Sequence, residues 1–196
     1  MNVVIDFNKK YGVVDYLSWN DDIRRELIDG AVKLMSGVSK LHNRVTVRLT
    51  KIYETFFENK NIDYFVFHAP FDVFLSDDTV VQPDFGIVCD LTKVMDNGIN
   101  GVPDFIVEVL SPTSLKRDVH EKFSLYEKHG IREYWVISPI EKCVNVFLLQ
   151  PDGKYDNGTP YDINQNLDIP ISIMEGLKIK VSDILRNSTL NTKGKM

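Results

Sequence analysis

The segment VPDFIVEVLSPTS, residues 102–114, contains the apolar run that most constrains the fold. At the period of two of a β-strand, its apolar side chains occupy both faces: Phe105, Val107 and Val109 on one, Ile106 and Leu110 on the other. A strand that is apolar on both sides usually lies centrally in a sheet that is covered on both faces. Residues 104–110 therefore predict a buried central strand.

Glu108 is the one charged side chain within the apolar run of residues 105–110. An unpaired ionised carboxylate in such a place costs several kcal/mol, so Glu108 needs a partner. A buried Lys or Arg, a raised pKa that keeps the acid neutral, or a metal cation would each serve. The strand alone does not distinguish these three possibilities.

Two helices are predicted before and after the strand. Ser36 and Ser39 are cap candidates for a helix that continues to about residue 58, with apolar side chains three to four positions apart. A second helix is predicted within residues 111–130, where Gly130 marks its C-terminal end. Each helix carries one apolar face and is expected to cover the sheet.

Further strands are predicted at about residues 62–75 and 79–89, and at 134–137 with a second strand directly after it. The dipeptide Asp29-Gly30 predicts a hairpin. The second helix crosses between the strands at 104–110 and 134–137. This order of elements indicates an α/β or α+β fold with a mixed central β-sheet flanked by helices.

The chain of 196 residues fits a single domain, since domains commonly run to ~100–200 residues. We assign residues 1–186 to this domain and expect residues 187–196 to be a disordered C-terminal tail. No apolar run approaches the ~20 residues of a membrane span, and the N-terminus lacks the apolar stretch of a signal peptide. We therefore expect a cytoplasmic protein that does not bind membranes.

The net charge of −5 does not indicate a nucleic-acid-binding protein, because such domains usually carry a basic surface. It does not exclude one either. Carboxylates that hold a cation lower the net charge, and a local basic patch still contacts phosphates.

Asp84 is a second acid within an apolar strand-like segment, VVQPDFGIVC. If its strand lies beside that of Glu108, the two carboxylates point to one place and repel each other unless a cation or a shared proton lies between them. Such pairs typically hold Mg²⁺ together with water and substrate phosphate. Lys122, four residues after Asp118 on the following helix, is the candidate for balancing charge, and Glu26 is the least distinctive acid of the group.

Each of these residues also has a plain structural interpretation. Glu108 could form a structural ion pair. Asp84, after Pro83, could merely end a strand pairing, and Lys122 could be a solvated helix residue. His42 by itself is typical of a partly exposed helix residue. A serine nucleophile at Ser111 or Ser114 with His120 is disfavoured, because SPTS lacks the GxSxG turn.

Several segments in succession, ELIDG, SKLH, VQPDFGIVCD, VPDFIVEVLSPTS and EKFSLYEKHGIREYWVISP, resemble the Uma-two family of restriction-endonuclease-like proteins. The resemblance covers about residues 16–185. It implies the PD-(D/E)xK nuclease superfamily, with a restriction-endonuclease-like core and a metal-dependent phosphodiesterase site.

The resemblance also assigns residues. It implies that Asp84 is the acid of the PD element, that Glu108 is the acid of the (D/E)xK element, and that the main-chain carbonyl of Val109 is a further metal ligand. Leu110 stands where the motif has its lysine, and Lys122 resembles a lysine that has migrated to the following helix.

Two acids complete this set. Glu26 corresponds to an additional N-terminal acid of such sites. Asp118 matches a recurrent position of the family, and its role could be to orient Lys122.

The resemblance implies a metal-dependent endonuclease that hydrolyses phosphodiester bonds, with Mg²⁺ as cofactor, Mn²⁺ as a substitute, and DNA as the expected partner. The alternative is a catalytically inactive binding module of the same fold, which the absence of lysine at Leu110 favours slightly. Arg44 and Arg48, one helical turn apart, are candidates for phosphate contacts, or else solvated residues of the helix. A homodimer is expected, because nucleases that cut both strands often pair their sites and two-fold dimers are common.

Overall fold

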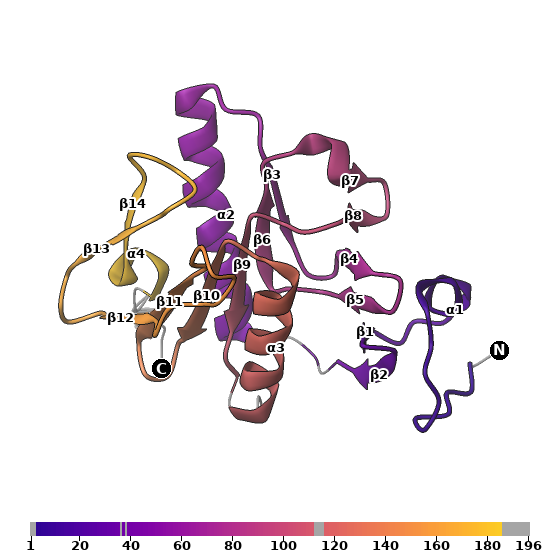
Figure 1. The fold of residues 1–196 in the computed structure, drawn as a ribbon. Coiled ribbons are helices and arrows are strands. Elements are labelled where there is room, and N and C mark those ends of the chain that lie inside the picture. The colour runs from indigo at the N-terminus through magenta and orange to yellow at the C-terminus, as the bar shows by residue number, and fades with distance from the viewer. Residues whose placement is uncertain (1–2, 36, 38, 112–115, 186–196) are drawn as a thin grey trace, which may run out of the picture.

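The computed structural model describes residues 3–35, 37, 39–111 and 116–185, and of residues 116–119 it describes the backbone only. Within these ranges the chain forms two six-stranded sheets, a two-stranded ribbon and four α-helices (Figure 1). The α-helices are α1 (Val13–Ser18), α2 (Lys40–Lys60), α3 (Lys116–His129) and α4 (Val181–Leu185), and the short 3₁₀ helix η1 spans Leu91–Lys93.

The first sheet has the strand order β2-β1-β5-β4-β8-β7. Its strands are β1 (Arg25–Ile28), β2 (Ala31–Leu34), β4 (Asp72–Ser76), β5 (Thr79–Val81), β7 (Val94–Met95) and β8 (Gly98–Asn100). The pairing of β1 with β2 is the predicted hairpin. Asp29 and Gly30 at its turn have φ of 45° and 78°, the left-handed conformations that a tight two-residue hairpin turn requires.

The second sheet has the order β12-β11-β10-β9-β6-β3. Its strands are β3 (Phe65–His68), β6 (Phe85–Val88), β9 (Phe105–Val109), β10 (Glu133–Ser138), β11 (Cys143–Leu148) and β12 (Thr159–Asp162). The remaining strands, β13 (Asp168–Pro170) and β14 (Lys178–Lys180), form the ribbon. β9 lies inside the second sheet and pairs parallel with β10, and α3 makes the predicted crossing between them.

The two helices predicted from apolar periodicity cover opposite faces of the second sheet (Figure 1). Side chains of α2 pack with Phe105, Val107 and Val109 of β9, whereas α3 packs with Ile106 and Leu110. The alternation read from the sequence is therefore correct, and the α+β class with a mixed sheet flanked by helices is confirmed. Glu108 lies on the side that faces α3.

α2 begins at Ser39, whose hydroxyl accepts a hydrogen bond from the His42 backbone N–H at 3.2 Å. This N-cap agrees with the prediction, while the other candidate, Ser36, lies outside the described residues. Asn61, in the left-handed conformation, ends the helix. The cap places His42 in the first turn of α2.

Two predicted strands are wrong as continuous elements. Residues 62–75 divide into β3 and β4, and residues 79–89 into β5 and β6, with each half in a different sheet. Pro70, which follows a cis peptide bond, and Pro83 lie at the two breaks. Proline has no N–H to donate to a strand ladder, so pairing stops there. Asp84 consequently lies where the chain passes from one sheet to the other.

Gly86, in the middle of β6, is required by close packing. A Cβ at this position would contact the Phe67 ring and lie 3.0 Å from the Phe105 carbonyl oxygen. We expect Gly86→Ala to lower the free energy of unfolding by about 1–3 kcal/mol, the usual cost of overpacking a core. Urea denaturation would measure it.

Gly37→Ala is the matched control for Gly86→Ala. A Cβ at Gly37 meets no atom within 4 Å, so its effect should stay within about 0.5 kcal/mol. Equal stability of the two variants would contradict the packing argument.

Of the described helices, none is both long enough and apolar enough to cross a membrane.

Candidate active site

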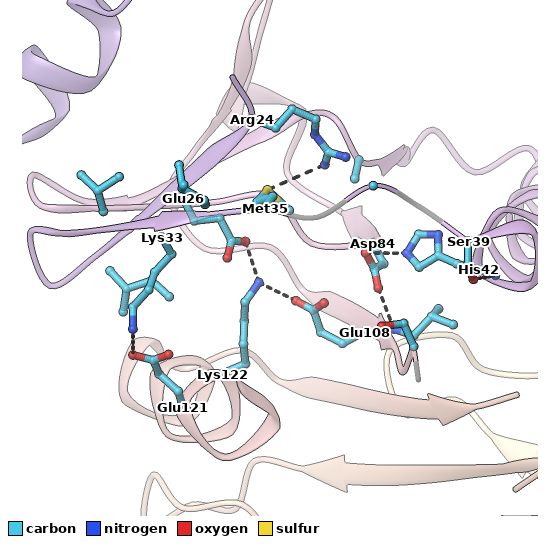
Figure 2. Close-up of a pocket in the computed structure, with 17 residues that line it drawn as sticks. Arg24, Glu26, Lys33, Met35, Ser39, His42, Asp84, Glu108, Glu121 and Lys122 are labelled. Carbon is cyan, nitrogen blue, oxygen red and sulfur yellow. Dashed lines mark hydrogen bonds and ion pairs between the residues drawn. The ribbon is translucent and has the colours of Figure 1, made fainter. Parts of the chain in front are cut away.

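A cavity of about 370 Å³ opens between the β1–β2 hairpin, the start of α2, the ends of β6 and β9, and α3 (Figure 2). Glu26, Asp84, Glu108 and Lys122, the four residues predicted to be catalytic, all line it. They come from β1, the β5–β6 connection, β9 and α3, which are far apart in the sequence. The two sheets meet at this cavity, since Glu26 belongs to the first and Glu108 to the second.

Lys122 links the two glutamates. Its Nζ lies 2.6 Å from Glu26 Oε1 and 2.9 Å from Glu108 Oε1. All three side chains are largely shielded from solvent, with exposed fractions of 14%, 7% and 16%. Of the partners that the sequence left open for Glu108, the structure supplies the buried lysine. The interpretation of Lys122 as a solvated helix residue is wrong.

Glu108 also accepts a hydrogen bond from Tyr126 Oη, at 2.6 Å. Burial raises the pKa of Glu108 to about 7 against the opposing effect of Lys122, and the nearby Asp84 and Glu26 carboxylates raise it further. Lys122 and Tyr126 bond the same oxygen, Oε1, so Oε2 accepts from no residue that the structure describes.

Lys122 remains protonated at neutral pH. Burial by itself lowers the pKa of its ammonium, but the Glu108 and Glu26 carboxylates outweigh burial and hold the pKa above its ordinary value. Lys122 can therefore donate hydrogen bonds and supply positive charge, but it is not a base at neutral pH.

Asp84 is held from two directions. Its Oδ2 accepts a hydrogen bond from the Val109 backbone N–H at 2.7 Å, and His42 Nε2 lies 2.6 Å from its Oδ1. The expectation of a partly exposed His42 is wrong, because 7% of the residue is exposed and it packs beside Asp84. His42 thus lies against Asp84 at the cavity. The Val109 carbonyl stays a prediction as a metal ligand.

The donor set suits a divalent cation. Glu26, Asp84 and Glu108 gather three carboxylates beside the single ammonium of Lys122. Burial is the main cause of the raised pKa of Glu108, and the two neighbouring carboxylates add to it. Hard carboxylate oxygens are the ligands that Mg²⁺ prefers, and Mg²⁺ commonly takes one or two of them, with water and phosphate completing its shell. Within the described ranges, no three His, Cys, Asp or Glu side chains converge closely enough to hold a metal by themselves. Asp84 and Glu108 would hold it together with water and phosphate.

The remaining predicted residues lie apart from this cluster. Arg48 Nη1 donates to the Ile184 carbonyl at 2.8 Å and so anchors α2 to α4, while Arg44 does not line the cavity. The side chain of Asp118 lies outside the described residues, as does Ser114. His120 is exposed and is not among the residues that line the cavity.

The sequence analysis did not single out three residues that contact or line the acidic cavity. Tyr126 has the spacing of a core residue, and nothing in that pattern marks its hydroxyl as a donor to Glu108. Gln82 donates its backbone N–H to Glu26 Oε1 at 2.9 Å, and Arg24 lines the cavity beside it. The position of Gln82 two residues before Asp84 was a usable signal. Arg24, one of two adjacent arginines, carried none.

The fold is shared with a solved structure that is described as a nuclease. A crystal structure of a "putative nuclease belonging to DUF820" from Anabaena variabilis has the same fold, with a TM-score of 0.73, 18% identity, and coverage of 89% of this chain and 97% of that one.

The chain belongs to the Uma2 family, described as "Putative restriction endonuclease", whose model matches residues 13–182. Family membership and fold together confirm the resemblance found in the sequence and make the chain nuclease-like.

Two relatives from Synechocystis sp. are similar over most of their length. "Uncharacterized protein slr1290" is 24% identical over 144 residues, which are 72% of this chain and 75% of the relative. "Uncharacterized protein sll1609" is 25% identical over 179 residues, 88% of this chain and 99% of the relative.

Proposed function

We propose that this protein is a metal-dependent endonuclease that hydrolyses phosphodiester bonds of DNA. One observation carries the proposal. Asp84, Glu108 and Lys122, which come from three separate parts of the chain, meet in one cavity with the acids able to hold a cation and the lysine protonated. A structural ion pair needs one acid for one lysine, whereas this cavity gathers three acids.

In the proposed site, Asp84 and Glu108 would hold the cation, with Mg²⁺ as the cofactor and Mn²⁺ as a substitute. The cation supplies Lewis-acid chemistry when bound, by polarising a phosphoryl oxygen and lowering the pKa of an attacking water. Asp84 is kept in orientation by the Val109 N–H and by His42. Glu108 would bind the cation through Oε2, because its Oε1 accepts hydrogen bonds from Lys122 and Tyr126.

Lys122 would act on charge in the reaction. Because its ammonium stays protonated, it serves to stabilise negative charge on the phosphoryl oxygens or to orient the attacking water by donating a hydrogen bond. Glu26 holds that ammonium from the other side, at 2.6 Å, and is itself held by the Gln82 N–H. Glu26 is thus a positioning residue for Lys122.

Cleavage of supercoiled plasmid DNA tests the proposal. We expect nicking in Mg²⁺ or Mn²⁺ and none in EDTA, with the Glu108→Gln protein inactive in all three, which excludes a contaminating nuclease. Nicking that persists in EDTA or in Glu108→Gln would contradict the proposed site.

The second candidate is a binding module of the same fold that cleaves nothing. The ion pairs of Lys122 with Glu26 and Glu108 favour it, because they balance part of the acidic charge without a metal. Binding of DNA without nicking under all conditions would support this candidate. A homodimer in the cytoplasm belongs to either proposal, and light scattering would measure the oligomeric state.

A further inference from the structure

Arg24 brings a positive charge into the cavity without a carboxylate partner. Its guanidinium donates from Nε, at 3.1 Å, and from Nη2, at 2.9 Å, to one neutral oxygen, Gln82 Oε1. It forms no salt bridge to any acid in the described part of the chain, whereas the neighbouring Arg25 pairs with Asp21 at 2.8 Å. The charge of Arg24 is therefore not neutralised by an ion pair.

Gln82 is itself held in one orientation. Its Nε2 donates to Asp72 Oδ1 at 2.9 Å, which turns its carbonyl oxygen toward Arg24. Asp72 accepts a second hydrogen bond, from Tyr16 Oη at 2.8 Å. Burial and the Asp72 carboxylate raise the pKa of Tyr16, so its hydroxyl stays a donor. This chain of contacts holds Arg24 in place through Gln82.

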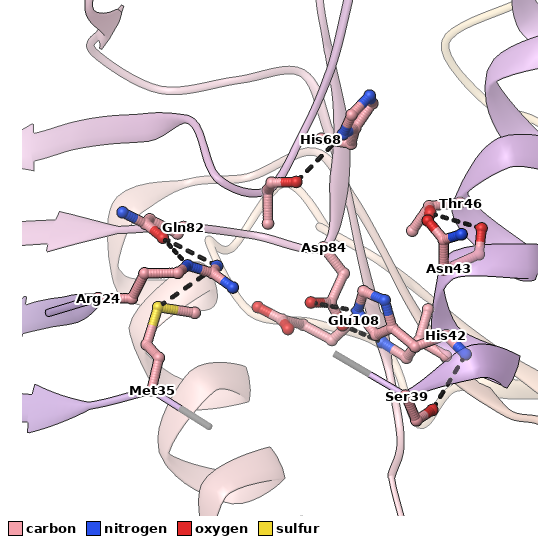
Figure 3. Close-up of polar contacts among 12 residues, drawn as sticks. Arg24, Met35, Ser39, His42, Asn43, Thr46, His68, Gln82, Asp84 and Glu108 are labelled. Atoms are coloured by element: carbon pink, nitrogen blue, oxygen red, sulfur yellow. Dashed lines mark hydrogen bonds and ion pairs between the residues drawn. The ribbon is translucent and has the colours of Figure 1, made fainter. Parts of the chain in front are cut away.

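The position of the guanidinium relative to the acids is the second observation. Arg24 lines the cavity, and in Figure 3 its guanidinium lies beside Gln82 and points toward the side where Asp84 and Glu108 lie. Its third nitrogen, Nη1, donates to no residue that the structure describes, and Nη2 has, besides Gln82, a weak contact with Met35 Sδ at 3.8 Å. Donors thus remain available on the cavity side.

We propose that Arg24 binds a phosphate oxygen of the nucleic acid next to the scissile phosphate, and that Gln82 is the residue that positions it. The guanidinium is always charged and offers paired donors that match a phosphate. A cavity with three carboxylates repels a polyanion, so binding needs positive charge that no local acid neutralises. A glutamate at position 82 would neutralise it, whereas the neutral amide holds Arg24 and leaves its charge in place.

This inference rests on the proposed function and names a substrate contact of the same site. The first experiment uses inorganic phosphate as the probe, in EDTA, and follows the arginine Nε–Hε signals in ¹⁵N-resolved NMR spectra. We expect the Arg24 signal to shift saturably as phosphate is added. The signal is assigned to Arg24 because it is absent from the spectrum of Arg24→Gln. In Gln82→Glu, Arg24 is still present but its charge is neutralised by the new carboxylate. The affinity for phosphate should therefore fall roughly tenfold, because the hydrogen bond from Arg24 to phosphate is weakened. An Arg24 signal that does not move overturns the proposal.

The second experiment measures binding of a fluorescent DNA duplex in a Lys122→Met background. We expect added Arg24→Gln to raise Kd roughly tenfold and to reduce the slope of log K against log salt by about one. Arg132→Gln is the matched control, because Arg132 pairs with Asp104 at the opposite end of the parallel strands β9 and β10. Equal Kd values for the two variants contradict the proposal.

Neither experiment reads cleavage, so the two proposals fail separately. An inactive protein that binds phosphate through Arg24 would refute the nuclease and leave the phosphate contact standing. A protein that nicks plasmid while the Arg24 signal does not respond to phosphate would refute the phosphate contact and leave the nuclease standing.

Discussion

Lys122→Met is expected to lower the rate of DNA cleavage by about 10²–10³-fold, the usual cost of removing one donor that stabilises charge in a transition state. The physical reason lies in the position of its ammonium, 2.9 Å from Glu108 and protonated at neutral pH. Metal binding should remain nearly intact, because Asp84 and Glu108 are still present. Single-turnover nicking and calorimetric titration with Mn²⁺ measure the two quantities.

Lys128→Met is the control for this experiment. Lys128 lies on the same helix but pairs with Asp29 at the surface, at 2.7 Å, so we expect its removal to leave cleavage within about twofold, as for a surface ion pair. Unaltered cleavage in Lys122→Met would remove Lys122 from the mechanism. Loss of Mn²⁺ binding together with activity would instead assign it a structural role in forming the metal site.

The metal-free protein is expected to lose stability relative to Glu108→Gln as the pH rises from about 4.5 to about 7. Burial raises the pKa of Glu108 to about 7, from an ordinary value of 4.5 in the unfolded chain. The folded state therefore holds this proton more tightly. The resulting stabilisation is fully present below about pH 4.5 and is lost as the pH passes about 7.

The size of this effect follows from the shift in pKa. The free energy of unfolding of the wild-type protein minus that of Glu108→Gln should fall by on the order of 3 kcal/mol over this range. Urea denaturation of both proteins in EDTA, at a series of pH values, measures the difference. A difference that does not change with pH would mean that Glu108 has the same pKa in the folded and the unfolded chain, with Lys122 offsetting the effect of burial completely.

Much of the fold follows from patterns within short stretches of sequence. The two apolar faces of residues 104–110 require cover on both sides, and α2 and α3 supply it. The Asp29-Gly30 turn forms the expected hairpin, and Ser39 caps α2. Each of these features depends on neighbours a few residues apart, which is why the sequence alone predicts it. The division of residues 62–75 and 79–89 between two sheets was missed, although Pro70 and Pro83 marked the breaks.

The acids of the site were also within reach of the sequence. Asp84 and Glu108 stand out because charge is costly in apolar strands. Lys122 and Glu26 were weaker candidates, to which the family resemblance gave a place in the site. The sequence could not identify the partner of Glu108, because Lys122 lies 14 residues after it on another element. Glu26, which binds the same lysine, lies 96 residues before Lys122.

By itself, then, the sequence determined the central strand, its covering helices and the identity of the acids, because these depend on local periodicity and on the cost of burying charge. Only the tertiary structure decided that the Lys122 ammonium lies between two glutamates, that His42 and the Val109 N–H hold Asp84, and that Gln82 holds Arg24 without neutralising it. Such contacts join residues from separate elements of the chain, and their geometry is set by how the two sheets and the helices pack together.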